Sequence, residues 1–270
     1  MQTLYLNDLA ARIVDASEPD GCAEPRCVQF LLLFYALTGR DDLAEHAGLS
    51  LAAALRDYRA ASSVRDRSAW VEVFVDARGL AEDPRVADAI ADLSERLRAD
   101  WTAASIADRA SAVDGCLRAA ALPEHQALAA GAIDQLESIV RSAYRPGSGV
   151  GAYVDQISVA GALLSAYQLS GRLPYPMLAE ELIAAAGPVL ANEEFAVSCQ
   201  TARVLCRLAV LHGDDDYRGA AIVAPRADYR RDAEAILERL SAEADRRGTA
   251  GAIYGVALLE LESTHLHAND

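Results

Sequence analysis

The sequence predicts an all-α protein that forms an (α/α)6 toroid, a ring of six helical hairpins. Apolar residues recur at helical spacing along the 270 residues, Ala and Leu dominate, and Gly or Pro marks nearly every gap between apolar segments. One hairpin plan repeats with a period of about 45 residues, which is typical of helical-hairpin repeats. The chain also begins and ends with helices that lack a partner next to them in sequence. Together these observations favour a ring of repeated helix pairs.

The repeated unit is an apolar helix end, a short polar turn, an anchoring residue and an Ala-rich helix. Its five copies are ALTGRDDLAEHAGLSLAAAL, GLAEDPRVADAIADLSERL, AALPEHQALAAGAIDQLESI, QLSGRLPYPMLAEELIAAA and VLHGDDDYRGAA. The helices before these turns should begin near residues 24, 66, 111, 155 and 196, with a last one near 250. The helices after them should begin near residues 41, 84, 124, 174 and 226, and residues 3 to 16 supply one more.

One segment departs from the helical pattern. WVEVFV, residues 70 to 75, alternates like a β-strand. It lies inside a continuous run, from DRSA to DARGLA, that is too long for a typical strand. We therefore expect a helix here, with a strand as the alternative.

The two unpaired end helices favour a closed ring over an open superhelix. The helix at residues 3 to 16 and the helix in GTAGAIYGVALLELES belong to opposite types, so each can complete the other's hairpin. Closure also hides the apolar end faces that an open array has to cap. The more apolar helices, such as FLLLFYALT and GALLSAY, should form the inner ring, and the more charged ones the outer ring. We expect one toroid domain over residues 1–270.

Composition excludes several classes of function. A net charge of -15 repels phosphate backbones and anionic lipid, so neither nucleic acid nor a membrane is an expected partner. All 25 basic residues are Arg, which excludes Schiff-base chemistry, pyridoxal phosphate attachment and a P-loop lysine. The apolar runs carry too many charges to span a bilayer, and the N-terminus does not have the pattern of a signal peptide. We expect a cytoplasmic protein without a cofactor or a metal.

The five cysteines fit reduced thiols better than disulfides, because their number is odd and they form no framework of close pairs. We expect all of them on inner helices, namely Cys22, Cys27, Cys116, Cys199 and Cys206. There they would pack as small apolar residues. A thiol nucleophile or a zinc site is the alternative, although no inner histidine is available to activate a thiol or complete a zinc set.

The chain from residue 151 onward resembles a known family. The segments that carry the resemblance are GAYVDQISVAGALLSAYQLSGRLPYPMLAEEL, CQTARVLCRLAVLHGDDDYR, RRDAEAILERL and GTAGAIYGVALLELE. They resemble the C-terminal helical region of the thioredoxin-domain proteins related to spermatogenesis-associated protein. Those proteins in turn resemble six-hairpin sugar enzymes such as the N-acylglucosamine epimerases. The resemblance implies the toroid fold and a small, sugar-like substrate.

A candidate site follows from the ring itself. If the inner helices run parallel, their N-termini meet at one mouth, where unpaired amides and helix dipoles favour polar or anionic groups. The side chains expected there are Glu24, Arg26, Arg67, Trp70, Asp114, Tyr153, Asp155, Gln156 and Gln200. Asp114 and Asp155 would come from neighbouring inner helices and could divide acid and base roles. Trp70 or Tyr153 could stack on a sugar ring, and Arg26 or Arg67 could hold a carboxylate.

Each of these residues also has a structural interpretation. Asp155 is a favoured N-cap, Asp114 lies in a capping-box pattern, SAVD, and the aromatic residues could pack in the core. The loop RPGSGVG before Asp155 could be a mobile flap or simply a long turn.

Two functions of different class therefore follow from the sequence. One is an enzyme or ligand-binding protein that acts on a small polar molecule in the mouth, with carboxylate acid–base chemistry of the hydrolase or isomerase kind. The other is a non-catalytic helical scaffold. An enzyme needs a pocket with convergent carboxylates of shifted pKa, whereas a scaffold would have a filled mouth and an apolar patch elsewhere.

Overall fold

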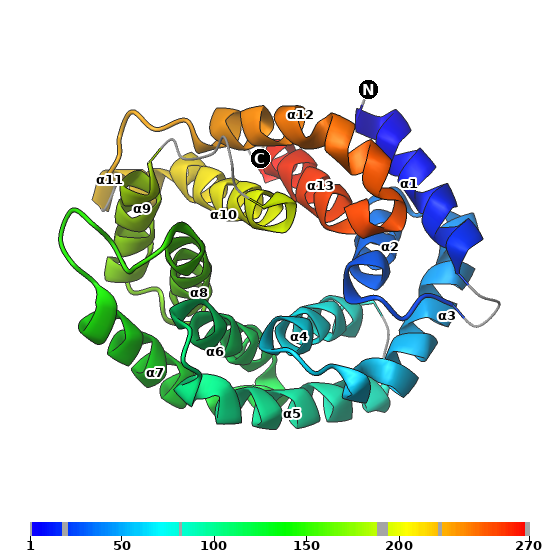
Figure 1. Cartoon of the computed structure of the whole chain (residues 1–270), viewed down its shortest axis with the longest axis horizontal. Helices are drawn as coiled ribbons and strands as arrows, with labels where there is room; N and C mark the ends of the chain where they lie inside the picture. The colour runs from blue at the N-terminus through cyan, green and yellow to red at the C-terminus, as the bar shows by residue number, and fades with distance from the viewer. Residues whose placement is uncertain (1, 18–20, 81–82, 188–193, 221–222, 268–270) are drawn as a thin grey trace.

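The computed structural model describes residues 2–17, 21–80, 83–187, 194–220 and 223–267. Over these ranges the chain forms helices and short 3-10 turns without a strand, arranged as two concentric rings (Figure 1). The inner ring consists of α2 (Pro25–Thr38), α4 (Val64–Arg78), α6 (Ile106–Ala120), α8 (Tyr153–Ser170), α10 (Phe195–Gly213) and α13 (Ala252–His267). The outer ring consists of α1 (Gln2–Ala16), α3 (Asp41–Asp57), α5 (Pro84–Ala99), α7 (Leu128–Ala143), α9 (Pro174–Ala186) and α12 (Tyr229–Arg247). A short helix, α11 (Asp215–Ala220), lies between α10 and α12.

The all-α toroid predicted from the hairpin repeat is thus confirmed. WVEVFV lies inside α4, so this segment is helical and its alternation does not mark a strand. The ring is closed by the two ends of the chain, since α1 packs beside α13. The rings of Tyr5 and Tyr254 meet edge to face there, with centroids 5.1 Å apart.

Apolar side chains fill the space between the two rings. Phe30 and Phe74 from the inner ring and Leu93 and Leu136 from the outer ring have no exposed surface. Burying a side chain of this size stabilises the fold by roughly 1.5–3 kcal/mol. A Cβ at Gly255 would lie 2.5 Å from Leu9 and 2.8 Å from Phe30, so the close packing of α13 requires glycine at this position.

The helix starts depend on local capping, and two of them correct a prediction. α6 begins at Ile106 rather than near residue 111, because the hydroxyl of Ser105 accepts a hydrogen bond from the amide of Asp108 at 3.3 Å. Asp114 therefore lies in the middle of α6 and not at its N-terminus. Similarly, α2 begins at Pro25, so Cys22 precedes the inner helix on which it was expected. None of the described helices is both long enough and apolar enough to cross a membrane.

Candidate functional site

A cavity of about 270 Å³ lies at the N-terminal ends of the inner helices. First-turn residues from five inner helices line it, namely Pro25, Arg65, Val154, Ala196 and Ile253. α6 contributes Ser111 and Asp114 from deeper in the ring. The N-termini of the inner helices therefore converge on one space, as parallel inner helices require. We call this space the central cavity.

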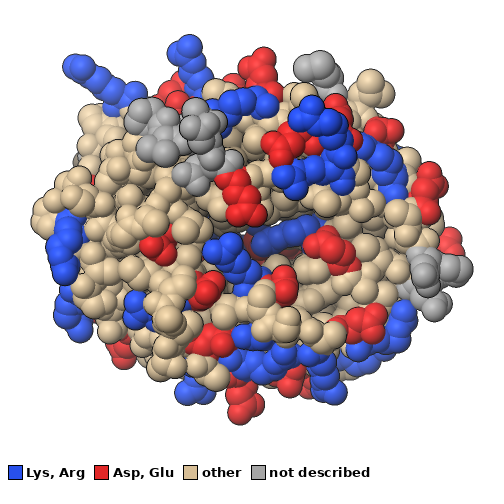
Figure 2. All heavy atoms as spheres, viewed as in Figure 1, with Lys and Arg blue, Asp and Glu red and all other residues tan. Residues whose placement is uncertain are grey.

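The central cavity is lined by side chains of both charges. Its guanidinium groups come from Arg26, Arg65 and Arg118, and its carboxylates from Glu24, Asp66, Glu72 and Asp114. Hydroxyl and amide groups come from Ser68, Ser111, Ser158 and Gln200. Figure 2 shows a face of the ring hollowed at its centre, with basic side chains in the hollow and acidic ones around it. The cavity thus offers hydrogen-bond donors and acceptors side by side rather than a field of one sign.

Glu72 on α4 contacts three arginines. Arg26 lies 2.6 Å from Oε2, Arg118 lies 3.1 Å from Oε1, and Arg203 donates to the same Oε1. Burial alone would raise the pKa of Glu72, but these three guanidiniums hold the pKa well below its ordinary value. Glu72 is therefore ionised at neutral pH, and it joins α4 to α2, α6 and α10.

Both carboxylate oxygens of Asp114 on α6 also accept a hydrogen bond. Its Oδ2 accepts from Arg118 at 3.0 Å, and its Oδ1 accepts from the hydroxyl of Ser165 at 2.5 Å. Burial tends to raise the pKa of Asp114, but Arg118, Arg207 and the Ser165 hydroxyl lower it overall. Asp114 is thus an ionised carboxylate that can accept a hydrogen bond or a proton.

Deeper in the ring the charged side chains continue as one network. Arg203, only 3% exposed, donates to Oε1 of Glu260 at 2.6 Å as well as to Glu72. Arg207 donates to the carbonyl of Gly161 at 3.1 Å and to the hydroxyl of Ser165 at 3.0 Å. We call the whole network the central charge cluster; it comprises Arg26, Gln29, Glu72, Asp76, Asp114, Arg118, Ser165, Arg203, Arg207 and Glu260.

Asp76 differs from the other carboxylates of the cluster. It accepts a hydrogen bond from Nε2 of Gln29 at 2.9 Å, and no arginine is paired with it among the described ion pairs. Burial, and then the neighbouring charge of Glu72, raise the pKa of Asp76 to about 6. Asp76 is therefore the carboxylate of the cluster that takes up a proton near neutral pH.

The sequence contains a signal for this cluster that the hairpin pattern does not reveal. Three inner helices carry, within their apolar middle parts, charged residues four positions apart, which places both on one helix face. These pairs are Glu72 and Asp76, Asp114 and Arg118, and Arg203 and Arg207. When several buried helices each carry such a pair, the pairs indicate a shared polar interior. Buried charges need partners of opposite sign, and these must come from the neighbouring helices.

Asp155 is placed outside the central cavity. The amide of Ala107, in the first turn of α6, donates to Oδ1 at 2.9 Å, and the amide of Ala152 donates to Oδ2 at 2.9 Å. One carboxylate thus satisfies amides at the starts of both α6 and α8. We call this contact the α6–α8 junction.

Gln156 is also buried, at 5% exposure, beneath the loop that precedes α8. The loop is held by hydrogen bonds between Arg145 and Gly149, and Val150 in it has no exposed surface. A Cβ at Gly149, where φ is +70°, would lie 2.2 Å from Oε1 of Gln156. Gly149, and Gly151 beside Asp155, therefore serve close packing against α8, which favours the long-turn interpretation of RPGSGVG.

Three more of the expected mouth residues have partners elsewhere. Arg67 donates to Asp100 at 2.6 Å and to the carbonyl of Ser62 at 2.7 Å. Trp70, at 4% exposure, stacks on Phe74 and borders a neighbouring cavity. The hydroxyls of Tyr153 and Thr201 lie 2.9 Å apart, beside a different surface cavity. Of the residues expected at the mouth, the central cavity brings together Glu24, Arg26, Asp114 and Gln200.

No family model matches this sequence, and a search of curated proteins found no match. Solved structures do match in fold. The GH76A alpha-1,6-mannanase from Salegentibacter sp. HEL1_6 superposes with a TM-score of 0.71 at 12% sequence identity, covering 97% of this chain and 99% of the mannanase. An unsaturated glucuronyl hydrolase specific for heparin superposes with a TM-score of 0.73 at 12% identity, covering 100% of this chain and 97% of the hydrolase.

These matches support the six-hairpin part of the resemblance to sugar enzymes. At such low identity they concern the fold alone, which this chain shares with carbohydrate-active hydrolases. In the described part of the chain no group of three His, Cys, Asp or Glu side chains is placed to hold a metal ion. The groups that line the central cavity are carboxylates, guanidiniums and hydroxyls.

Proposed function

We propose that this protein binds a small, sugar-like molecule with several hydroxyl groups in the central cavity. The proposal rests on one observation: guanidinium donors and carboxylate acceptors from different inner helices line one space of about 270 Å³. A hydroxyl group both donates and accepts, so a polyol can bond to both members of such a pair. The volume is near the lower end of ligand pockets, roughly 300–1,000 Å³, which favours a single sugar ring or a short oligosaccharide end.

The neighbours in fold support the choice of ligand class. An inactive variant of the same mannanase was solved in complex with alpha-1,6-mannotriose, and the other neighbour is specific for heparin. In this chain we assign acceptor roles to Asp114 and Glu24, and donor roles to Arg26 and Gln200. The finer likeness to the N-acylglucosamine epimerases stays a prediction.

Carbohydrate hydrolysis or isomerisation in the same cavity is the second candidate. It is favoured by Asp114, an ionised carboxylate beside the cavity that could act as a base. Asp155, the expected acid partner, has both oxygens bonded to backbone amides. Such catalysis would still need a protonated group of raised pKa in the cavity, and Asp76, the carboxylate of the cluster with that property, is not among the residues that line it. We therefore favour binding over catalysis.

Calorimetric titration tests the proposal. The full chain is titrated with alpha-1,6-mannotriose, mannose and glucuronate, and each mixture is then examined for hydrolysed or isomerised products. We expect at least one sugar to bind, and Gln200→Ala to weaken that binding about tenfold, because the variant loses a hydrogen bond to the ligand. Gln135→Ala, in outer helix α7, is the matched control and should bind as the parent does. Failure of all three sugars to bind would favour the scaffold alternative.

A further inference from the structure

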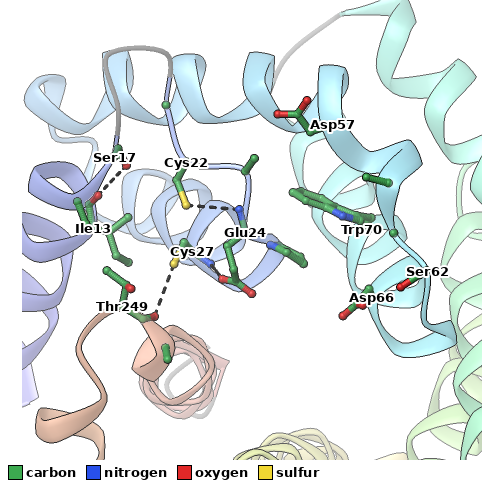
Figure 3. Close-up of a pocket in the computed structure, with 17 residues that line it drawn as sticks. Ile13, Ser17, Cys22, Glu24, Cys27, Asp57, Ser62, Asp66, Trp70 and Thr249 are labelled. Atoms are coloured by element: carbon green, nitrogen blue, oxygen red, sulfur yellow. Dashed lines mark hydrogen bonds between the residues drawn. The ribbon is translucent and has the colours of Figure 1, made fainter.

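A second cavity, of about 670 Å³, adjoins the central cavity. Glu24, Pro25 and Asp66 line both spaces, so the loop before α2 forms part of a wall between them. The remaining boundary comes from α1, from the end of α3 and the segment after it at residues 60–62, from Trp70 on α4 and from η5 (Gly248–Gly251). Figure 3 shows this cavity with Cys22, Cys27 and Glu24 facing Trp70. We call it the thiol cavity.

Cys22 and Cys27 lie together on the wall of the thiol cavity, and both are thiols in the structure. The two thiols are close enough that each shifts the pKa of the other. The Cys27 thiol donates to the carbonyl oxygen of Thr249 at 3.6 Å. The amide of Glu24 donates to the Cys22 sulfur at 3.4 Å. Cys22 is half-buried, whereas Cys27 is only 2% exposed.

This environment makes Cys22 the more nucleophilic of the two thiols. The hydrogen bond from Cys27, and then the one from the Glu24 amide, lower the pKa of Cys22 to about 7. The sulfur also lies close to the N-terminus of α2, where the helix dipole stabilises a negative charge. The pKa of Cys27 is raised by the same hydrogen bond and by burial. The pair thus consists of a half-buried thiol of lowered pKa that borders a cavity and a buried thiol of raised pKa beside it.

We propose that Cys22 and Cys27 form an oxidation site, at which a hydroperoxide that enters the thiol cavity converts the two thiols to a disulfide. The Cys22 thiolate attacks the terminal peroxide oxygen, the O–O bond breaks, and the alcohol leaves with a proton. The sulfur of Cys27 then attacks the Cys22 sulfenic acid, forms the S–S bond and releases water. The dithiol loses two electrons, and the hydroperoxide is reduced to an alcohol and water.

The other three cysteines do not share these features. Cys116, Cys199 and Cys206 are buried within inner helices, and burial raises the pKa of each to about 12. They fit the packing role that the sequence predicts for the thiols. Oxidation should therefore be selective for the pair at the thiol cavity.

Disulfide formation would also change a contact that closes the ring. Cys27 would lose the hydrogen that it can donate to Thr249, so a link between α2 and η5 would be removed. The same loop carries Glu24, whose Oε2 accepts from the amide of Cys27 at 2.8 Å and which lines both cavities. The oxidation state of the pair is thus coupled to the wall that the two cavities share.

Peptide mapping tests this proposal without reference to any sugar. The reduced full chain is treated with hydrogen peroxide at neutral pH, and remaining thiols are blocked with iodoacetamide before digestion. Because the chain has no lysine, trypsin cuts only after arginine and separates Cys22, in peptide 13–26, from Cys27, in peptide 27–40. We expect these two peptides to appear joined by a disulfide, while Cys116, Cys199 and Cys206 are alkylated only after unfolding.

Three variants sharpen the test. Cys22→Ser should leave Cys27 reduced, because the nucleophile is missing. Cys27→Ser should retain Cys22 as a sulfenic acid that a cyclic 1,3-diketone traps. Cys199→Ser is the matched control and should form the disulfide as the parent does. If peroxide leaves Cys22 and Cys27 as thiols in the parent, or oxidises the buried cysteines as readily, the proposal is wrong.

Discussion

The central charge cluster and the α6–α8 junction both contain a partly buried carboxylate from an inner helix, yet they use it differently. In the cluster, Asp114 accepts from side chains, Arg118 and Ser165, beside a cavity. At the junction, Asp155 accepts from the backbone amides of Ala107 and Ala152. Side-chain partners can turn toward a ligand, whereas backbone amides at helix starts cannot. The comparison indicates that the cluster can serve binding and that the junction serves the fold.

The largest expected effect concerns the charge balance of the cluster. Glu72→Gln removes the negative charge that Arg26, Arg118 and Arg203 share. Breaking a buried ion pair from one side is strongly destabilising, so we expect unfolding free energy to fall by about 3–5 kcal/mol. Urea unfolding measures the change. Glu243→Gln, which breaks an exposed pair with Arg247, should cost less than about 1 kcal/mol. If both variants lost the same unfolding free energy, the central charge cluster would not stabilise the fold more than an exposed ion pair does.

The junction should show the next largest effect. Asp155→Ala leaves the amides of Ala107 and Ala152 without their acceptor, which should cost about 2 kcal/mol, or about 1 for each cap. Asp155→Asn should recover no more than half of this loss, because Asn offers one acceptor oxygen and the junction uses two. Thermal and urea unfolding of both variants measure the cost.

Ser105→Ala, which removes a single cap bond at the start of α6, is the matched control and should cost about 1 kcal/mol. Sugar binding should survive in every junction variant that folds. If Asp155→Asn were as stable as the parent but lost the sugar, Asp155 would belong with the ligand, and the contrast between the two regions would fail.

The fold could be predicted from the sequence because its determinants are local and repeated. Helical periodicity, turn residues and the unpaired end helices all occur in the linear order of the chain, so the closed ring and the helix at residues 70–75 were predictable. The start of α6 was missed because two Ser-containing capping patterns, SIAD and SAVD, compete within ten residues. The earlier one forms the cap, and Asp114 lies nine residues into the helix as a result.

The site could be predicted only in part, for a physical reason. Glu24, Arg26, Asp114 and Gln200 were predicted near the mouth and do line the central cavity. We did not predict Glu72, Arg118 and Arg203 from the sequence, although the four-residue spacing of charges on their helices was visible. An ion-pair partner of each lies on another helix, and the sequence does not show which helices face each other. Asp155 shows the converse, since a capping carboxylate and a ligand-binding one have the same sequence pattern at a helix start.

Asp114→Asn tests whether the cluster serves binding more than stability. Arg118 keeps Glu72 as its ion-pair partner and the Asn oxygen can still accept from Ser165, so the unfolding free energy should change by only about 1 kcal/mol. The affinity for a bound sugar should fall about tenfold, because a charged acceptor is replaced by a weaker neutral one. Asp134→Asn, at an exposed position of outer helix α7, is the control and should leave both quantities unchanged. Unchanged affinity in Asp114→Asn would place this carboxylate with Asp155 as a structural group.

The smallest expected effect separates the two regions by their response to pH. The pKa of Asp76 is raised from 3.8 to about 6, so the folded protein binds this proton at a higher pH than the unfolded chain does. The folded state should therefore gain about 1 kcal/mol of stability from Asp76 as the pH falls from 7 to 5, a gain that is absent above the folded pKa.

Asp76→Asn cannot titrate, so its stability should lack this gain. Ser105→Ala, at the start of α6, should lose the same unfolding free energy at pH 7 as at pH 5. Urea unfolding of the three proteins at pH 5, 6 and 7 measures the difference between the curves. A constant offset between the parent and Asp76→Asn across this range would mean that Asp76 is ionised like Glu72 and Asp114, and that the cluster holds no carboxylate able to supply a proton near neutral pH.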